Sequence, residues 1–220
     1  MNTLLIRLSA PMQSWGTQSR FTMRDTGLEP SKSGVLGLLC AALGIDREDD
    51  EGLRPLAFLR MGVRVDKEGL LQVDYHTAQN VLMANGKTKD TELSNRYYLA
   101  SAVFLVGLES EDLTLLERIQ SALQKPVWPL FLGRKAFVPG EPIQLLDGLY
   151  AGETLEGALQ NYPCLREPSS EKLRLVIEDN NGSIVRSDQP ISFARSTRKF
   201  APRRVRVDFV PAPEPLKETA

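Results

Sequence analysis

The feature that most constrains the fold is the order in which strand-like and helix-like segments follow one another. Short runs rich in branched or alternating apolar residues indicate strands, and apolar residues at helical spacing indicate helices. The strand-like segments are 3–8, 56–66, 70–78, 96–108 and about 142–150, and the helix-like segments are 30–44 and 111–123. This β-α-β-β-β-α-β order predicts an α+β protein with a ferredoxin-like sheet over residues 1–150.

Two further regions are expected beyond this body. Residues 80–95 carry an Asn85-Gly86 turn signal and predict an extended hairpin or arm inserted between strands. Residues 157–170 are loop-like, 172–188 read as a hairpin and 203–210 alternate as a half-exposed strand. We therefore expect a small C-terminal β region at 151–210, packed on the body, and a disordered Pro-rich tail at 211–220.

Composition excludes several classes of protein. A chain of 220 residues can bury a sizeable core, and it has no apolar run near the roughly 20 residues that span a bilayer. It also lacks the pattern of a signal peptide, so a cytoplasmic protein without a membrane partner is expected. The two cysteines, Cys40 and Cys164, are far apart and His76 is the sole histidine, which excludes a clustered metal site. No cofactor is expected.

Two short motifs have glycine beside cationic residues. "PSKSGVLG", at 30–37, begins a helix with Ser31, Lys32 and Ser33, and the amides of a helix start suit a phosphate. The alternative is an ordinary helix cap, with glycines for close packing. "LGRKAFVP", at 132–139, sets Arg134 and Lys135 beside a glycine that would let backbone approach a phosphodiester. Here the alternative is a solvated turn.

Two other stretches are candidates for chemistry or RNA binding. In "DYHT", at 74–77, Asp74 and His76 share a strand face, so His76 could act in acid–base chemistry or only form hydrogen bonds. "ISFARSTRKFAPRRVRV", at 191–207, interleaves Arg195 and Arg198 with phenylalanines and contains no acid, although the net charge of the chain is −1. Charge with aromatic surface suits single-stranded RNA, and a solvated strand face is the alternative.

Six motifs, in this order, make the chain similar to one known family. They are "LIRLSAPMQSWG", "PSKSGVLGLLCAALGI", "DYHT", "RYYL", "FLGRKAF" and "ISFARSTRKF". Over roughly residues 2–207 the sequence resembles the CasD family, the subunit of type I-E CRISPR Cascade complexes that holds the 5′ end of the guide RNA. The resemblance implies an RRM-like body of the repeat-associated mystery protein (RAMP) superfamily with a β-hairpin thumb at about 78–95.

The resemblance also implies partners and site residues. The protein would cap the 5′ handle of the CRISPR guide RNA in an antiviral ribonucleoprotein. It would contact the backbone subunit and the large subunit that reads the protospacer-adjacent motif, and target DNA only indirectly. In this interpretation Trp15 stacks or wedges and Gln13 bonds a base edge. The expected RNA-binding residues are Gln13, Ser14, Trp15, Arg20, Arg24, Ser31, Lys32, Ser33, His76, Arg134, Lys135, Arg195 and Arg198.

Two alternatives remain open from the sequence. A related type I-C subunit cuts guide RNA with a Tyr/Lys/His set, and Tyr75, His76 and Lys87 loosely match that set. A metal-independent endoribonuclease that processes repeat RNA is therefore the second hypothesis, and a protein-interaction domain with an incidental basic face is the third. The type I-E motifs dominate, so we expect a non-catalytic subunit.

Overall fold

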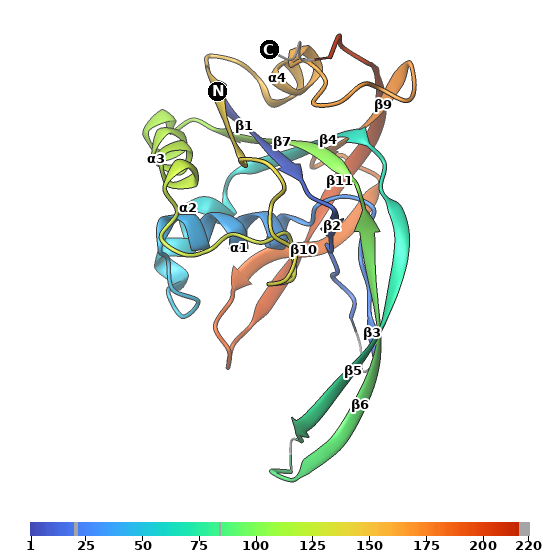
Figure 1. Cartoon of the computed structure of the whole chain (residues 1–220). Helices are drawn as coiled ribbons and strands as arrows, with labels where there is room; N and C mark the ends of the chain where they lie inside the picture. Colours follow the sequence, from blue (N-terminus) through green and yellow to red (C-terminus); the bar gives the residue numbers. More distant parts are fainter. Residues whose placement is uncertain (20–21, 84, 216–220) are drawn as a thin grey trace.

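A seven-stranded antiparallel sheet forms the centre of the molecule (Figure 1). The computed structural model describes residues 1–19, 22–83 and 85–215. In order across the sheet, the described strands are β10 (Ile184–Ser192), β11 (Lys199–Pro211), β9 (Lys172–Glu178), β4 (Arg60–Lys67), β7 (Val103–Ser110), β1 (Asn2–Ser9) and β8 (Gln144–Ala151). An α+β class with a mostly antiparallel sheet is therefore confirmed.

Helices cover both faces of this sheet. One apolar cluster joins Leu4, Ile6 and Leu8 of β1 to three helices on one face, and another joins Leu5 to a short helix on the other. The three helices are α1 (Lys32–Leu43), α2 (Asp50–Ala57) and α3 (Leu113–Gln124), and the short one is α4 (Leu155–Asn161). Because both faces of β1 are buried, its sequence is nearly continuous in apolar residues rather than strictly alternating.

Local capping explains why the two longer helices were predictable. The Ser31 hydroxyl accepts a hydrogen bond from the Gly34 amide at the start of α1, and Gly44 ends that helix with φ 73°. Asp112 caps α3 in the same manner through the amide of Leu115. Side chains that accept amide hydrogen bonds at the start, and glycine in the left-handed conformation at the end, are strong local signals. Both predicted helices are confirmed.

A long hairpin, which we call the arm, extends away from the body between β4 and β7 (Figure 1). Its strands are β5 (Leu70–Leu82) and β6 (Thr88–Ala100), and Gly86 turns at the tip with φ 79°. At its base β6 also pairs with the short strands β2 (Met12–Gln13) and β3 (Met23–Arg24). The arm is thus longer than the predicted residues 78–95. The single strand predicted at 96–108 is wrong, because Ser101, with φ 56°, separates β6 from β7.

Three other predictions differ from the structure. The strand predicted at 56–66 starts only at Arg60, because α2 runs to Ala57. The segment 157–170, expected to be a loop, begins inside α4, which Thr154 caps. The hairpin predicted at 172–188 is wrong, because β11 lies between β9 and β10. The Asn-Gly signal marks the turn correctly, but long-range pairing decides which strands become neighbours.

The predicted disordered tail also differs where it is described. The Cys164 amide donates to the carbonyl of Glu214 at 3.1 Å, and its thiol contacts the carbonyl of Pro213. Residues 211–215 therefore lie against the body, and residues 216–220 of the predicted tail lie outside the described part. Within the part of the chain that the structure covers, no helix is long and apolar enough to cross a membrane.

Candidate nucleic-acid interface

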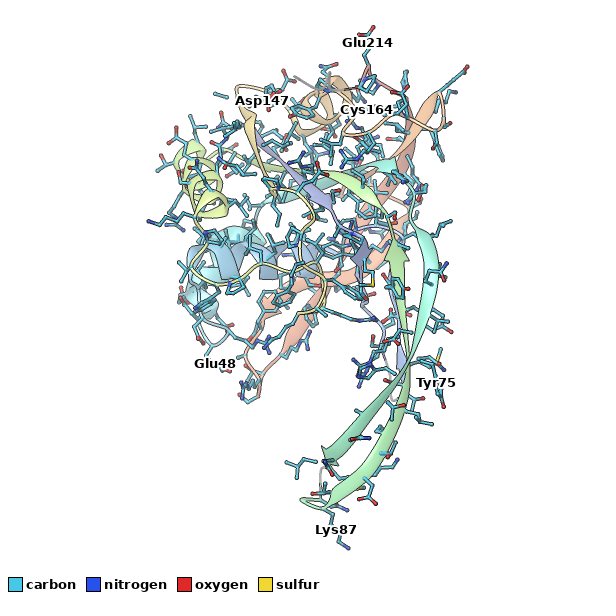
Figure 2. All side chains as sticks on the ribbon, viewed as in Figure 1. Glu48, Tyr75, Lys87, Asp147, Cys164 and Glu214 are labelled. Carbon is cyan, nitrogen blue, oxygen red and sulfur yellow. The ribbon has the colours of Figure 1, made fainter. Side chains whose placement is uncertain are left out.

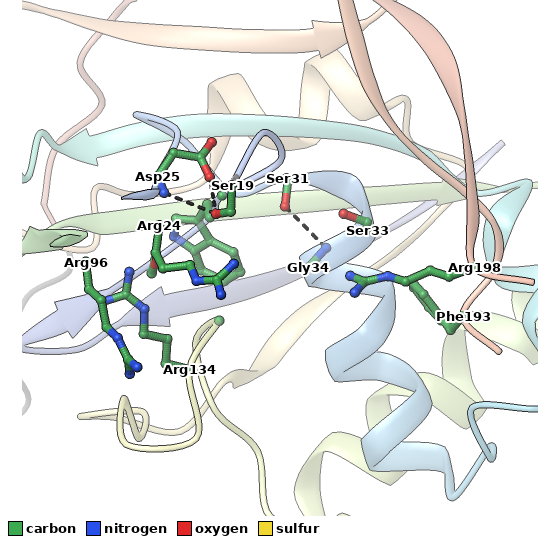
Figure 3. Close-up of a pocket in the computed structure, with 14 residues that line it drawn as sticks. Ser19, Arg24, Asp25, Ser31, Ser33, Gly34, Arg96, Arg134, Phe193 and Arg198 are labelled. Carbon is green, nitrogen blue, oxygen red and sulfur yellow. Dashed lines mark hydrogen bonds between the residues drawn. The ribbon is translucent and has the colours of Figure 1, made fainter. Parts of the chain in front are cut away.

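Four arginines from four separate segments line one cavity, which we call the arginine pocket (Figure 3). The pocket has a volume of about 410 Å³. It is bounded by β3, β6, the loop between α3 and β8, and the loop between β10 and β11. The arginines from these segments, in that order, are Arg24, Arg96, Arg134 and Arg198. The start of α1 forms the wall between Arg198 and the other three (Figure 3).

A tight backbone contact fixes the position of Arg134. Its neighbour Gly133 has φ 92°, and a Cβ added there would overlap the carbonyl oxygen of Ser14. Ser14 in turn donates its amide to the Leu132 carbonyl at 3.1 Å. The Arg134 guanidinium donates to the Tyr97 carbonyl at 2.7 Å and lies 5.3 Å from the ring centre of Phe137. Only glycine permits this approach, so the glycine beside Arg134 serves the protein's own packing.

The charges around Arg134 do not cancel. Arg24 lies directly opposite Arg96 in the pairing of β3 with β6. Burial first, and then repulsion from Arg96 and Arg24, lower the pKa of the Arg134 guanidinium, although Asp74 and Asp25 act in the opposite direction. Clustered cations held by the fold attract an anion, because a bound phosphate relieves their mutual repulsion. The pocket is therefore suited to a phosphate group.

Asp25 orders the loop that forms one edge of the pocket. Its carboxylate accepts hydrogen bonds from the amides of Thr17 and Gln18 and from the hydroxyl of Ser19. Burial raises the pKa of the Asp25 carboxyl, but these hydrogen bonds outweigh burial and lower it overall. A Cβ added at Gly16 would lie 2.4 Å from the Asp25 carbonyl oxygen. The loop thus depends on an ionised Asp25 and on glycine at position 16.

The start of α1 does not offer the free phosphate site that the sequence predicted. The Lys32 amide donates to the Asp188 carboxylate at 2.7 Å, and the Gly34 amide is taken by Ser31. The Lys32 side chain is only 2% exposed and forms an ion pair with Glu178 at 2.9 Å. The prediction that Lys32 binds phosphate is corrected on these grounds, because the carboxylates of Asp188 and Glu178 already contact its amide and its ammonium. Ser31 lines the arginine pocket, where its hydroxyl serves as the helix cap.

Gln13 and Trp15 are also internal rather than surface groups. The Gln13 amide nitrogen donates to the Ala102 carbonyl at 2.8 Å, and its oxygen accepts from the Trp15 indole at 3.2 Å. Both side chains are buried, and a Cβ at Gly34 would lie 2.9 Å from the indole ring. The prediction that Trp15 stacks on a base and Gln13 bonds a base edge is therefore wrong for this structure. The "PMQSWG" motif instead packs between the end of β1 and the start of α1.

The remaining predicted residues fall into separate places. Ser14 and Ser33 line the arginine pocket with Arg24, Arg134 and Arg198, whereas Lys135 lines a neighbouring hollow. Arg195 is exposed and donates its backbone amide to Glu48 at 3.0 Å. Arg20 lies outside the described residues. With Trp15 and Ser31, which also line it, the structure thus brings seven of the predicted residues to one cavity.

His76 belongs to the arm and does not line the arginine pocket. Its Nδ1 lies 3.4 Å from a carboxylate oxygen of Asp74, which confirms that the two share a strand face. Tyr75 points to the opposite face, and Lys87 lies at the far tip of the arm (Figure 2). Among the described residues, no group of three or more His, Cys, Asp or Glu could hold a metal ion.

Sequence reasoning missed Arg96 and Asp25. Arg96 opens the "RYYL" motif, where it reads as the polar start of a strand, and Asp25 lies in a loop without a motif. Both join the pocket only through tertiary structure, because the pairing of β3 with β6 sets Arg96 beside Arg24. The parallel pairing of a two-residue strand leaves no periodic signal that could have revealed it.

The fold and the pocket together define an α+β protein with a confined cationic site, and comparisons place it in a family. The model of a family described as "CRISPR-associated protein (Cas_Cas5)" matches residues 3–206. The Cascade subunit CasD of Escherichia coli (strain K12) is 34% identical over 177 residues, covering 72% of this chain and 76% of that protein.

Two solved structures agree with this match. One, described as a Cas protein, is 46% identical with a TM-score of 0.79 and covers 96% of this chain and 98% of its own. Another, from a CRISPR RNA-guided surveillance complex, is 31% identical with a TM-score of 0.81, and the match covers 98% of this chain and 95% of that chain. The chain belongs to the CRISPR-associated Cas5 family, which confirms the resemblance to CasD.

Proposed function

We propose that this protein is a Cascade subunit that binds CRISPR guide RNA and caps its repeat-derived 5′ handle in an antiviral ribonucleoprotein. The observation that carries the proposal is the convergence of Arg24, Arg96 and Arg134 with Arg198 on one cavity. A single-stranded RNA offers several phosphates and can bend into such a pocket, whereas a duplex is too wide to enter it. The names of the two relatives from Cascade and from an RNA-guided complex support this assignment.

The arrangement of strands supports a ferredoxin-like, RRM-like body. Strands β8, β1, β7 and β4 lie side by side, and their chain order, with α1 and α3 as the crossings, is that of a split β-α-β unit. In this assignment the arm is the thumb, inserted in the hairpin that joins the second and third of these strands. The β9, β10 and β11 strands then extend the same sheet, rather than forming a separate C-terminal region.

The arm has two unlike faces, which supports a role at a subunit boundary. Exposed apolar side chains follow one face, and they are Leu71, Val73, Tyr75 and Leu93. The opposite face carries Asp74, His76 and Arg96, the last of which lines the arginine pocket. We propose that the polar face of the arm lies near the guide RNA and that its apolar face and tip contact the backbone subunit. The large subunit would lie nearby, and the assembled complex would be in the cytoplasm.

We also propose that the subunit is not catalytic. The Tyr75, His76 and Lys87 set is spread along the arm. Position 83, whose amide donates to the Lys87 carbonyl, lies seven residues further along the strand than position 76. At 3.3 Å per residue this is a separation of about 23 Å, too far for the three groups to act on one phosphodiester. This spacing supports RNA binding over the alternative of an endoribonuclease.

The salt dependence of RNA binding tests the proposed pocket. Replace Arg24, Arg96 and Arg134 singly by Gln, and measure the affinity for a labelled RNA carrying the repeat-derived 5′ segment over a range of salt concentrations. Each substitution is expected to weaken binding and to lower the log–log salt slope by about 0.7, the value for one phosphate contact with a single strand. Arg118→Gln is the control, because this exposed residue of α3 does not line the pocket. Slopes unchanged from the parent protein in all three variants would refute the site.

A further inference from the structure

A second hollow, which we call the groove, adjoins the arginine pocket. It has a volume of about 390 Å³, within the range of roughly 300–1,000 Å³ that is typical of ligand sites. The groove lies between α1, the segment 128–135 and the loop that carries Phe193 and Arg198. The two hollows share five lining residues, which are Ser33, Gly34, Gly133, Phe193 and Arg198. They are therefore parts of one continuous surface.

The groove combines aromatic surface with positive charge. Trp128 and Phe131 line it, and the Trp128 side chain is 41% exposed while its amide is anchored to the Ala41 carbonyl at 3.1 Å. Arg47, Lys135 and Arg198 supply cations to the same lining, which also includes one carboxylate, that of Asp46. An exposed indole held in place beside cations offers a stacking surface for a base and attraction for the attached phosphate.

Gly37 points to an occupant of the groove. It lies in the middle of α1, where glycine costs about 1 kcal/mol relative to alanine. Apart from its own helix backbone, no heavy atom lies within 4 Å of a Cβ built there, so close packing, the sequence-based alternative, does not explain it. Of the 16 glycines, it alone has neither a positive φ nor a neighbour within that distance. The open space above Gly37 belongs to the groove.

We propose that the groove receives one nucleobase of the RNA strand whose phosphates lie in the arginine pocket, with the base stacked on Trp128 and close to α1 at Gly37. The inference rests on the proposed function, because continuity with the arginine pocket is what selects a nucleotide over a peptide or a small apolar molecule. The arginine pocket would bind the backbone of any RNA, whereas the groove would sense whether a base is present at one position.

Filling the groove from α1 gives the sharpest test. Gly37→Leu places a side chain in the open space and leaves the arginines untouched, and leucine favours a helix more than glycine does. Gly37→Ala is the matched control, because it gives a similar helix benefit with one methyl group. We expect both variants to melt at or above the temperature of the parent protein. Gly37→Leu should bind the 5′-segment RNA about 10-fold more weakly, the loss expected for one base stack, and Gly37→Ala within 2-fold.

Trp128 provides an independent measurement. The chain has two tryptophans, and Trp15 is buried whereas Trp128 is partly exposed. The fluorescence of the parent protein minus that of Trp128→Phe therefore reports on Trp128. This signal should be quenched by the RNA, and the quenching should disappear for one member of a series in which each nucleotide in turn is made abasic. Trp128→Leu should weaken binding like Gly37→Leu, and Trp128→Phe should largely retain it.

The outcomes separate the inference from the proposed function. If the parent protein does not bind the RNA, the proposed function itself fails, and the groove inference fails with it. If the parent binds with the expected salt slope but Gly37→Leu and Trp128→Leu stay within 2-fold, the groove holds no base and the inference alone is overturned. Quenching that survives every abasic substitution would likewise overturn it. A peptide from a partner subunit as occupant would leave RNA affinity unchanged in both variants.

Discussion

At the scale of single residues, Asp25 affects the arginine pocket in two ways, through its charge and through its hydrogen bonds. It places a negative charge beside the arginine cluster, and it also holds the loop that carries one edge of the pocket. We predict that Asp25→Asn weakens RNA binding about 3- to 10-fold. The asparagine oxygen can still accept the amides of Thr17 and Gln18, but its NH2 group cannot accept the hydroxyl of Ser19 as the second carboxylate oxygen does. Affinity measured at one fixed salt concentration checks this.

Asp74→Asn is the matched control for that prediction. Asp74 also acts on the Arg134 guanidinium through charge, but it lies on the arm and makes no contact with the loop of residues 16–19. Removing its charge should strengthen binding a few-fold. Stronger binding in both variants would mean that Asp25 acts only through charge.

Lys32 is a cation that stabilises the folded protein rather than contacting the RNA. It is buried against Glu178, beside the pair that Asp188 forms with Arg203. We predict that Lys32→Met lowers the free energy of unfolding by about 2 kcal/mol, because the partly buried Glu178 carboxylate loses an ion-pair partner, although Arg203 still lies 3.7 Å from it. Urea denaturation measures the loss, and Arg195→Met should show none.

The second readout for Lys32 is the salt dependence of RNA binding. Because the Lys32 ammonium does not reach the arginine pocket, the log–log slope of the folded variant should equal that of the parent protein. A slope lower by about 0.7 would instead restore Lys32 as a phosphate contact.

At the scale of elements, local chemistry decided which segments were predictable. Ser31, Gly44 and Asp112 mark helix ends through hydrogen bonds made within a few residues, so sequence alone suffices. The α2 helix contains Pro55, and its last residues read in sequence as the start of the following strand. The end of this helix could therefore not be located from the sequence. The same limit applies to the site: Arg134 and Arg198 stand out in glycine-rich or aromatic motifs, whereas Arg96 joins the pocket only through strand pairing.

The arm is an element whose outer part can be removed without disturbing the rest. Ala78 pairs with Glu92, and Thr77 with Leu93, so replacing residues 78–92 by Asn-Gly joins two positions that already lie opposite each other. We predict a melting temperature within about 2 °C of the parent, because none of the residues that the structure describes in the removed segment belongs to either core cluster. Binding of the isolated RNA should change little.

Assembly is the property that this deletion should affect. Incorporation of the shortened protein into the ribonucleoprotein, measured by co-purification with the partner subunits and guide, should fall sharply, because Leu82 and Met83 are lost from the exposed tip. Normal incorporation would contradict the thumb assignment, and failure to fold would show that the tip contributes to the core.

At the scale of the whole molecule, the order of strands in the sheet depends on long-range pairing and could not be predicted from the sequence. The Asn-Gly turn after β9 correctly marked a chain reversal, yet β11 lies between β9 and β10. Apolar pattern shows that a strand is buried but not which strand lies beside it, since any alternating partner satisfies the same pattern. The α+β class and the α1 and α3 helices followed from the sequence, whereas the extension of the sheet by β9 to β11 did not.

The absence of catalysis is also a property to test on the whole chain. We predict that the purified protein, incubated with labelled repeat RNA at neutral pH in EDTA, leaves the RNA intact. Lys87 at the tip of the arm lies far from Tyr75 (Figure 2), and His76, next to Tyr75 in the chain, points to the opposite face of the strand. Site-specific cleavage that is lost in His76→Ala would establish the endoribonuclease alternative. Cleavage that persists in His76→Ala would indicate a contaminating nuclease.

The position of β1 between β7 and β8 has a consequence for synthesis of the chain. Asn2 pairs with Ser110 of β7 and with Ala151 of β8, so both neighbours of this strand are translated about 100 residues or more after it. At 5–20 residues per second, the apolar β1 segment waits about 5–20 s on the ribosome for its first partner. During that time α1, which leaves the ribosome soon afterwards, is the nearest surface that can shield one face of β1 from aggregation.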